Sequence, residues 1–231
     1  MLDVNRREFK YGITEYEAAE LRRKLPFVAP PDPNNGPRGY LVRSLYFDTV
    51  FDTDYEAKVD GLDRRRKIRL RIYDPDSRTV KLELKQKEGG FQRKRSLTLR
   101  RAEAERMIAG DYSGLVNREE PLARWLGVLM TAGCYLPRVI VEYEREAYCR
   151  DINDTRITFD SNLRATEADF DLFRRDLITY PVLFPGQITL EVKYNRFLMS
   201  DIKDVLRKTD RVQISNSKYC AARAITKRGR R

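Results

Sequence analysis

The segment RRRKIRLRIY at residues 64–73 constrains the fold of this chain more than any other segment. If it forms a strand, its side chains alternate between two faces. One face then carries Arg65, Lys67, Arg69, Arg71 and Tyr73, and the other carries Arg66, Ile68, Leu70 and Ile72. A single strand of this kind is compatible with a cationic face that lies in water, so its neighbours decide the interpretation.

The next two segments repeat the pattern. A turn is expected at Asp-Pro-Asp-Ser 74–77, because Pro presets the turn torsion and Asp and Ser hydrogen-bond the local backbone. In VKLELKQK, one face carries Lys81, Glu83, Lys85 and Lys87, and the other carries Val80, Leu82 and Leu84. The cation-rich segment QRKRSLTL follows two glycines. Like charges that face each other across a ladder are destabilising. Three such strands therefore predict a polyanionic ligand as the compensating charge.

The composition indicates a folded basic protein with an anionic partner. The 231 residues include 46 Lys and Arg against 35 Asp and Glu, which gives a net charge of +11. This balance favours nucleic acid, phosphates or an acidic surface as the partner. The hydrophobic content of 41% is enough for a core and excludes a disordered basic protein. We expect one domain that covers residues 1–231.

Several kinds of site are excluded by residue type. The chain has no histidine, which excludes His general bases, His–Cys zinc sites and Ser–His–Asp catalysis. Its cysteines, Cys134, Cys149 and Cys220, lie far apart without metal-ligand spacing, so we expect reduced thiols in a cytosolic protein. The first residues do not resemble a signal peptide, and no apolar run approaches the length of a membrane span.

Strands and helices are both predicted along the chain. Further strands are expected at 4–11, 40–48, 138–148, 156–165 and 187–195. Thr14 and Glu17 form a capping box for a helix that ends at Pro26. Pro121 suits the first turn of a helix at 118–132. Other helices are expected at 52–59, 100–109, 199–207 and 217–225.

This arrangement predicts an α+β fold built on a closed antiparallel β-barrel. Many strands carry one charged and one apolar face, and several helices need an apolar surface to cover. If the strands close with the charged side inward, the helices pack on the outside and the sheet has no edges. Unpaired buried charge is costly, so a lumen of Arg, Lys and a few Glu needs anions or metal ions. The lumen is therefore predicted to be a tunnel for a polyphosphate-like ligand.

A series of short motifs carries a family resemblance. In chain order they are RREFKY, SLYFDT, YEAKVDG, KIRLRIY, LELKQK, QRKRS, VEYER, RITFDSNL, LEVKYN and NSKY. Together they resemble the VTC domain, the polyphosphate-polymerase domain of the vacuolar transporter chaperone complex, within the triphosphate tunnel metalloenzymes. The wider superfamily begins with Glu-x-Glu-x-Lys, whereas here Arg6 takes the place of the first Glu before Glu8 and Lys10. This departure resembles VTC domains rather than the hydrolytic branch, and it removes one acidic metal ligand.

The resemblance implies roles for particular residues. The implied catalytic residues are Arg69, Arg71, Lys85 and Arg156. The implied phosphate or nucleotide contacts are Lys10, Ser217, Lys218 and one of Arg93, Lys94 and Arg95. The implied ligand for Mn²⁺ or Mg²⁺ is Glu191, which Glu142 and Glu144 are expected to assist. The alternative for the cationic strands is a structural salt-bridge network of Arg69 or Lys85 with Glu83 or Glu142.

The activity implied by the resemblance is that of an ATP-dependent polyphosphate polymerase, which transfers the γ-phosphate of ATP to a growing chain. Positioning and charge neutralisation do most of the work in phosphoryl transfer, so no histidine is needed. One alternative is a metal-dependent triphosphatase that acts on inorganic, thiamine or RNA-end triphosphate. Another is a non-catalytic module that binds polyphosphate or inositol phosphates.

The expected partners are ATP and inorganic polyphosphate. Nucleic acid is disfavoured, because the basic strands lack an aromatic platform on which bases could stack. We expect a cytoplasmic location. The family's eukaryotic members sit in membrane complexes, so an alternative is attachment to the inner face of a membrane through a partner.

Overall fold

The computed structural model describes residues 6–89, 91–207, 212–215 and 217–228. The chain forms two compact units that are interleaved in sequence. The first comprises residues 1–41, 143–163 and 183–216, and the second comprises residues 42–142, 164–182 and 217–231. Each unit has a hydrophobic core of its own. Two long strands, β6 (Tyr135–Arg150) and β7 (Thr155–Thr166), contribute residues to both units.

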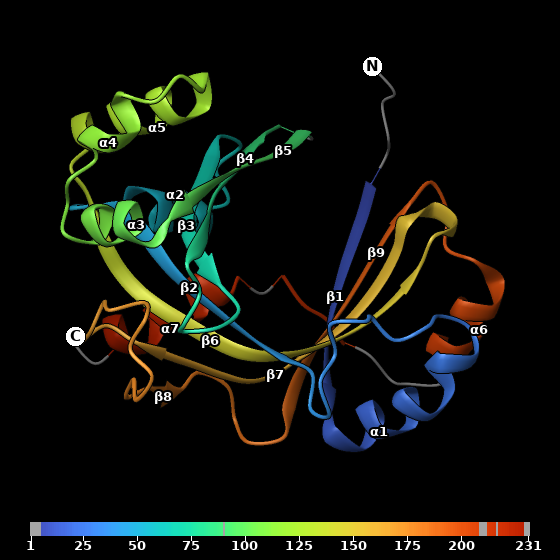
Figure 1. The fold of residues 1–231 in the computed structure, drawn as a ribbon. Helices are drawn as coiled ribbons and strands as arrows, with labels where there is room; N and C mark the ends of the chain where they lie inside the picture. The colour runs from blue at the N-terminus through green and yellow to red at the C-terminus, as the bar shows by residue number, and fades with distance from the viewer. Residues whose placement is uncertain (1–5, 90, 208–211, 216, 229–231) are drawn as a thin grey trace. The chain divides into compact units, whose positions relative to one another are not determined.

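The first unit is an antiparallel sheet with helices on one face. Its other elements are β1 (Arg6–Thr14), α1 (Glu15–Lys24), η1 (Leu25–Phe27), η2 (Ile152–Asp154), β9 (Gln187–Asn195), α6 (Ser200–Arg207) and β10 (Val212–Gln213). The strands follow the order β10-β1-β9-β7-β6. In Figure 1, α1 and α6 lie beside each other next to this part of the sheet.

Alternation of side chains explains why the helices cover one face of this sheet. Ile157, Phe159, Leu190 and Val192 point to the covered face and pack against Leu21 of α1. The helix α1 begins at the predicted capping box, in which Thr14 and Glu17 each accept from the other's backbone N–H. The charged residues between the apolar ones point to the opposite face of the sheet.

The second unit has the same construction. Its other elements are β2 (Tyr40–Thr49), α2 (Thr53–Val59), β3 (Arg65–Ile72), β4 (Thr79–Glu88), β5 (Phe91–Arg100), α3 (Arg101–Ile108), α4 (Ser113–Val116), α5 (Pro121–Ala132), β8 (Tyr180–Pro181) and α7 (Lys218–Arg228). The strands follow the order β6-β2-β3-β4-β5, and β8 pairs with the end of β7. Its core joins the apolar face of β3 and β4 to α3 and α5, as Leu70, Leu82, Met107 and Leu126 show.

The register of the second unit aligns the charged residues of three neighbouring strands. Ile68 lies opposite Leu84 and Leu70 opposite Leu82, so the apolar faces of β3 and β4 match. Because alternation is strict, the residues between them match on the other face. Hairpin β3–β4 therefore forms as the sequence predicts, with its turn at residues 73–78.

The predicted α+β class with antiparallel strands and helices is confirmed, but closure of the barrel is not. The strand order has two ends, β10 and β5, and no pairing joins these two strands within the described part of the chain. The sequence also did not predict α4, β8 and β10, which are short. Alternation shows which face of a strand is charged, whereas closure depends on long-range pairing that alternation does not specify.

Gly39 provides a test of backbone packing in the first unit. Its φ is +81°, and a Cβ there would lie 2.3 Å from the carbonyl oxygen of Arg145. Gly39→Ala should therefore lower the free energy of unfolding in urea by about 3 kcal/mol, from both strain and collision. Gly61 is the control, because its φ is +72° and nothing lies within 4 Å of its Cβ position. Gly61→Ala should cost only about 1 kcal/mol, and equal losses would contradict the collision.

Candidate functional site

One face of β3, β4 and β5 in the second unit is densely cationic. We call it the cationic face, and its cations are Arg65, Lys67, Arg69, Arg71, Lys81, Lys85, Lys87 and Lys94. Like charges face each other across the ladders, as predicted. Lys85 lies opposite Lys67 on one side and opposite Lys94 on the other. The predicted residues Arg69, Arg71, Lys85 and Lys94 are thus brought together on one surface.

A single carboxylate, Glu83, lies among these cations. It is buried, and its carboxylate oxygens form ion pairs with nitrogen atoms of Arg69 and Arg71 at 2.7 Å each and of Lys94 at 2.6 Å. Burial opposes its ionisation, but the two guanidinium groups and Lys94 hold the pKa of Glu83 at about 2. The structural salt-bridge alternative therefore holds for Arg69 and Glu83. The negative charge of Glu83 compensates only part of the positive charge on this face.

Both arginines make further contacts, and one donor of Arg71 has no bonded acceptor among the described residues. Arg69 Nη1 donates to the Tyr46 hydroxyl at 3.1 Å. The guanidinium of Arg71 lies 5.1 Å from the ring centre of Tyr73. Within the described part of the chain, no acceptor bonds the buried Nε of Arg71. A buried donor without a partner costs free energy, so Arg71 is suited to bind an added acceptor such as a phosphate oxygen.

The N-terminus of α7 lies against the same face. Ser217 is buried, and its hydroxyl accepts from the backbone N–H of Cys220 at 3.3 Å and contacts the ammonium of Lys67. Helix N-termini attract anions because their backbone N–H groups point outward and the helix dipole is positive there. Ser217 directly precedes the first helical residue, Lys218, as the sequence predicts.

The strand register distinguishes among the three candidate cations of β5. Lys94 lies opposite Lys85, whereas Arg95 lies opposite Leu84 and Arg93 opposite Gln86. Arg95 consequently belongs to the other face, where its guanidinium lies 5.2 Å from the ring centre of Trp125 and donates to Gln86 at 2.7 Å. The structure differs here from the expectation that Arg95 contacts phosphate, because strict alternation places only Lys94 on the cationic face.

The first unit has a mixed charged surface around Glu191. Its Oε1 lies 2.8 Å from Lys193 and 3.9 Å from Lys10, and its Oε2 lies 3.5 Å from Arg145. Arg156 lies opposite Lys193 across the ladder and is held by Asp32 at 2.8 Å. The predicted Lys10, Arg156 and Glu191 therefore share one face of the sheet.

Arg145 was missed by the sequence reasoning. Two bonds of 2.7 and 2.8 Å join it to Asp160, and it also approaches Glu191. Burial disfavours its charge, but the groups around it, Tyr143 first and then Asp160 and Glu191, raise the pKa of Arg145. Alternation along β6 could have identified Arg145. It places Tyr143 and Arg145 on one face of the strand, opposite to Glu142 and Glu144.

The structure differs from the expectation that Glu142 and Glu144 assist Glu191. Glu142 binds Arg43 at 2.9 Å, on the face where β2 presents Leu45 to the core. Glu144 alternates with Arg145, so it lies on the face opposite to that of Glu191. The acid-rich face of β6 is polar because it carries ion pairs beneath loops and helices, such as that between Glu146 and Arg22 of α1.

Glu191 has the donor chemistry for a divalent metal ion. Mg²⁺ is commonly held by one or two carboxylates together with substrate phosphates and water. The described residues contain no cluster of three or more His, Cys, Asp or Glu side chains suited to a metal. The single carboxylate of Glu191 fits this mode, in which phosphate oxygens and water supply the other metal ligands. Lys193, which now binds Glu191, would then turn toward the phosphate.

Comparison with protein families matches residues 5–227 to the VTC domain. The chain belongs to the VTC domain family. The family resemblance predicted from the motifs is thereby confirmed. The family is typically enzymatic, and tunnel metalloenzymes depend on a divalent metal ion.

Solved structures share the fold of this VTC domain at low sequence identity. A proposed adenylyl cyclase from Hippeastrum, described as having a dominant triphosphatase activity, matches with a TM-score of 0.57 and 14% identity over 94% of each chain. A proposed adenylate cyclase from Bacillus halodurans matches with a TM-score of 0.52 and 13% identity, over 91% of this chain and 93% of its own. The search of curated proteins found no match. Among the described residues, no helix is long and apolar enough to cross a membrane.

Glu83→Gln tests the counter-charge on the cationic face. The pKa of Glu83 lies below its usual 4.5, so its stabilisation is present above pH 4.5 and is lost as the pH falls through about 2. The variant should lose about 3 kcal/mol of unfolding free energy at pH 7, and the difference should shrink toward pH 2. The control is Glu120→Gln, because Glu120 pairs with Arg118 at the exposed surface and such pairs contribute little. Equal effects of the two variants would contradict a buried counter-charge.

Glu191→Gln tests the metal ligand. The variant keeps the size of the side chain and removes its charge, so we expect a folded protein that no longer binds Mn²⁺ in the presence of tripolyphosphate. Binding can be followed by the electron paramagnetic resonance signal of unbound Mn²⁺. Glu144→Gln removes a carboxylate on the opposite face and should leave Mn²⁺ binding unchanged. Unchanged binding by Glu191→Gln would place the metal ligand elsewhere.

Proposed function

We propose that this VTC domain is an ATP-dependent polyphosphate polymerase. The observation that carries the proposal is the cationic face, on which eight Lys and Arg side chains of three adjacent strands surround one carboxylate. Such a surface suits a linear polyanion, because Arg clasps phosphates with two bonds and Lys supplies point charges. A triphosphatase fold neighbour from Hippeastrum supports a triphosphate as the substrate class.

The proposed chemistry requires little covalent work from the protein. A terminal oxygen of the polyphosphate chain attacks the γ-phosphorus of ATP and forms a new P–O bond. The bond between the γ-phosphorus and the β–γ bridging oxygen breaks, and its electron pair leaves with ADP. The attacking oxygen is already anionic, so no general base is needed. A bound divalent metal ion supplies charge neutralisation and polarises phosphoryl oxygens.

The cationic residues have distinct proposed roles. Arg69 and Arg71 stand two residues apart on β3, about 7 Å along the strand, and bind neighbouring phosphates of one triphosphate. Phosphate oxygens then replace Glu83 as acceptors of their N–H groups. Lys85 and Lys94 neutralise the same chain from β4 and β5.

The decisive experiment is incubation of the purified protein with ATP and Mn²⁺, followed by a gel stained for polyphosphate. We expect a ladder of long chains and release of ADP. Orthophosphate without polymer would instead indicate a triphosphatase. Binding of polyphosphate without turnover would indicate a binding module.

Arg69→Ala and Arg71→Ala test the roles of the two arginines. If they stabilise charge that develops during transfer, each variant should lower kcat by roughly 10²- to 10³-fold, as removal of an oxyanion donor does. If they only bind substrate, KM should rise with kcat unchanged. Arg64→Ala is the control, because Arg64 precedes β3, is exposed, pairs with the exposed Glu88 and is not among the eight cations of the cationic face. A double variant with the wild-type rate would show that the cationic face is only a solvated surface.

A further inference from the structure

Two buried aspartates anchor α7 to the rest of the second unit. Asp48 is fully buried at the end of β2. Its carboxylate accepts from the backbone N–H groups of Thr49, Asp54 and Tyr55 at 2.8–2.9 Å, which fixes the first turn of α2. It also accepts from the hydroxyl of Tyr219 in α7 at 2.6 Å. Asp48 therefore joins the start of α2 to the first turn of α7.

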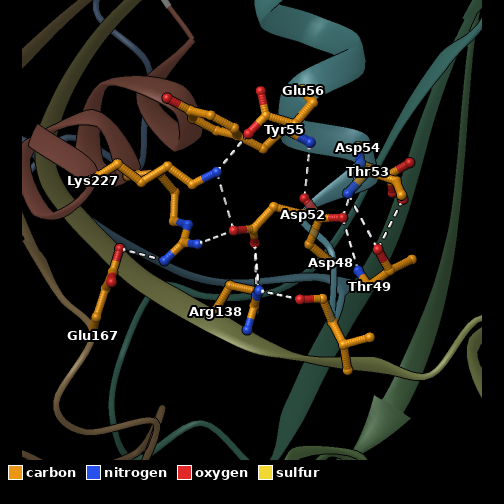
Figure 2. Close-up of polar contacts among 12 residues, drawn as sticks. Asp48, Thr49, Asp52, Thr53, Asp54, Tyr55, Glu56, Arg138, Glu167 and Lys227 are labelled. Atoms are coloured by element: carbon orange, nitrogen blue, oxygen red, sulfur yellow. Dashed lines mark hydrogen bonds and ion pairs between the residues drawn. The ribbon is translucent and has the colours of Figure 1, made fainter. Parts of the chain in front are cut away.

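Asp52 supplies the second anchor, one turn further along α7. Figure 2 shows its carboxylate at the centre of a group of cations from different elements. Arg138 of β6 reaches Oδ1 at 2.7 Å, and from α7 Arg223 reaches Oδ2 at 2.6 Å and Lys227 reaches it at 3.2 Å. Burial opposes ionisation of Asp52, but the bond from Arg138 and the attraction of Arg223 hold its pKa below the usual value.

The anchored residues lie on one side of α7. Tyr219, Arg223 and Lys227 are four residues apart, so they share one face of the helix. Two further carboxylates bind the same side, since Arg223 lies 2.8 Å from Glu167 and Lys227 lies 2.6 Å from Glu56. Three successive turns are thereby held, which fixes both the rotation of α7 and its position along its axis.

This anchoring determines where the N-terminus of α7 lies. Tyr219 stacks on Tyr46 with ring centres 5.1 Å apart, and Tyr46 accepts from Arg69 of the cationic face. Ser217, two residues before Tyr219, contacts Lys67 of the same face. A rotation or shift of α7 would therefore move Ser217 away from the cationic face, together with the next residue, Lys218.

We propose that Asp48 and Asp52 are positioning residues for phosphate binding. They touch no ligand themselves, and they hold α7 so that Ser217 and Lys218 complete the phosphate contacts of the cationic face. The inference rests on the proposed function, because it concerns the same bound phosphates. It assigns a role to two carboxylates that would otherwise only weaken a basic site by their negative charge.

Asp52→Asn is a test in which the loss of positioning and the loss of negative charge have opposite expected effects on the affinity for an anion. Asp52 has a left-handed backbone with φ of 56° and ψ of 35°, which Asn tolerates as well as Asp. Removal of a negative charge should strengthen binding of an anion if only the net charge matters. Positioning predicts the reverse, a Kd for tripolyphosphate raised about tenfold in isothermal titration calorimetry, equivalent to about 1.4 kcal/mol. Glu105→Gln on α3 is the control for charge, because Glu105 pairs only with Arg101 at the surface in the described contacts.

A double-mutant cycle separates positioning from general destabilisation. If Asp52 acts through the helix terminus, Asp52→Asn should cause no further loss in a Ser217→Ala/Lys218→Ala background. Tyr219→Phe is the second variant, because it removes only the bond to Asp48 without a change of charge. It should also weaken tripolyphosphate binding, and it should have no further effect on binding when combined with Ser217→Ala/Lys218→Ala.

The outcomes are distinguishable. Wild-type binding in both Asp52→Asn and Tyr219→Phe, or losses that add fully to those of Ser217→Ala/Lys218→Ala, would overturn the positioning role and leave the proposed function intact. Absence of tripolyphosphate binding by the wild-type protein would overturn the proposed function together with this inference. Should Asp52→Asn fail to fold, Tyr219→Phe carries the same cycle.

Discussion

The contact of Glu83 with Arg69, Arg71 and Lys94 is the interaction on which the cationic face depends. Aligned β3, β4 and β5 place like charges opposite one another, and this repulsion opposes the strand pairing that the apolar core favours. One buried carboxylate offsets part of the repulsion, because it binds three of the eight cations of the face. The excess of positive charge on this surface attracts a polyanion.

In both units, the two faces of the sheet differ in the same way. Apolar residues of alternate positions pack beneath helices, and the charged residues between them form a surface on the other side. In the first unit that surface is mixed in charge, with Glu191 held by Lys193 and approached by Arg145. In the second unit it is almost purely cationic.

The helix α7 links the fold to the proposed chemistry. Its polar side is bound by carboxylates of β2, α2 and the segment after β7, and its N-terminus lies at the cationic face. Backbone N–H groups at a helix N-terminus are rigid donors, so their value for phosphate binding depends on where the helix is held. Buried aspartates in this basic unit are understandable in this way, as anchors of a cation-rich helix.

Local sequence patterns predicted the α+β class, the charged and apolar faces of the strands, the capping box at Thr14 and the family. These follow from local rules, namely alternation, capping and the order of motifs. The three-dimensional structure was needed to show that Lys94 rather than Arg95 joins the cationic face and that Glu142 binds Arg43 instead of assisting Glu191. It also revealed Glu83 as the shared partner of three cations and the anchoring of α7 by Asp48 and Asp52. These contacts join residues distant in the sequence, and they depend on strand register and helix docking, which no local pattern encodes.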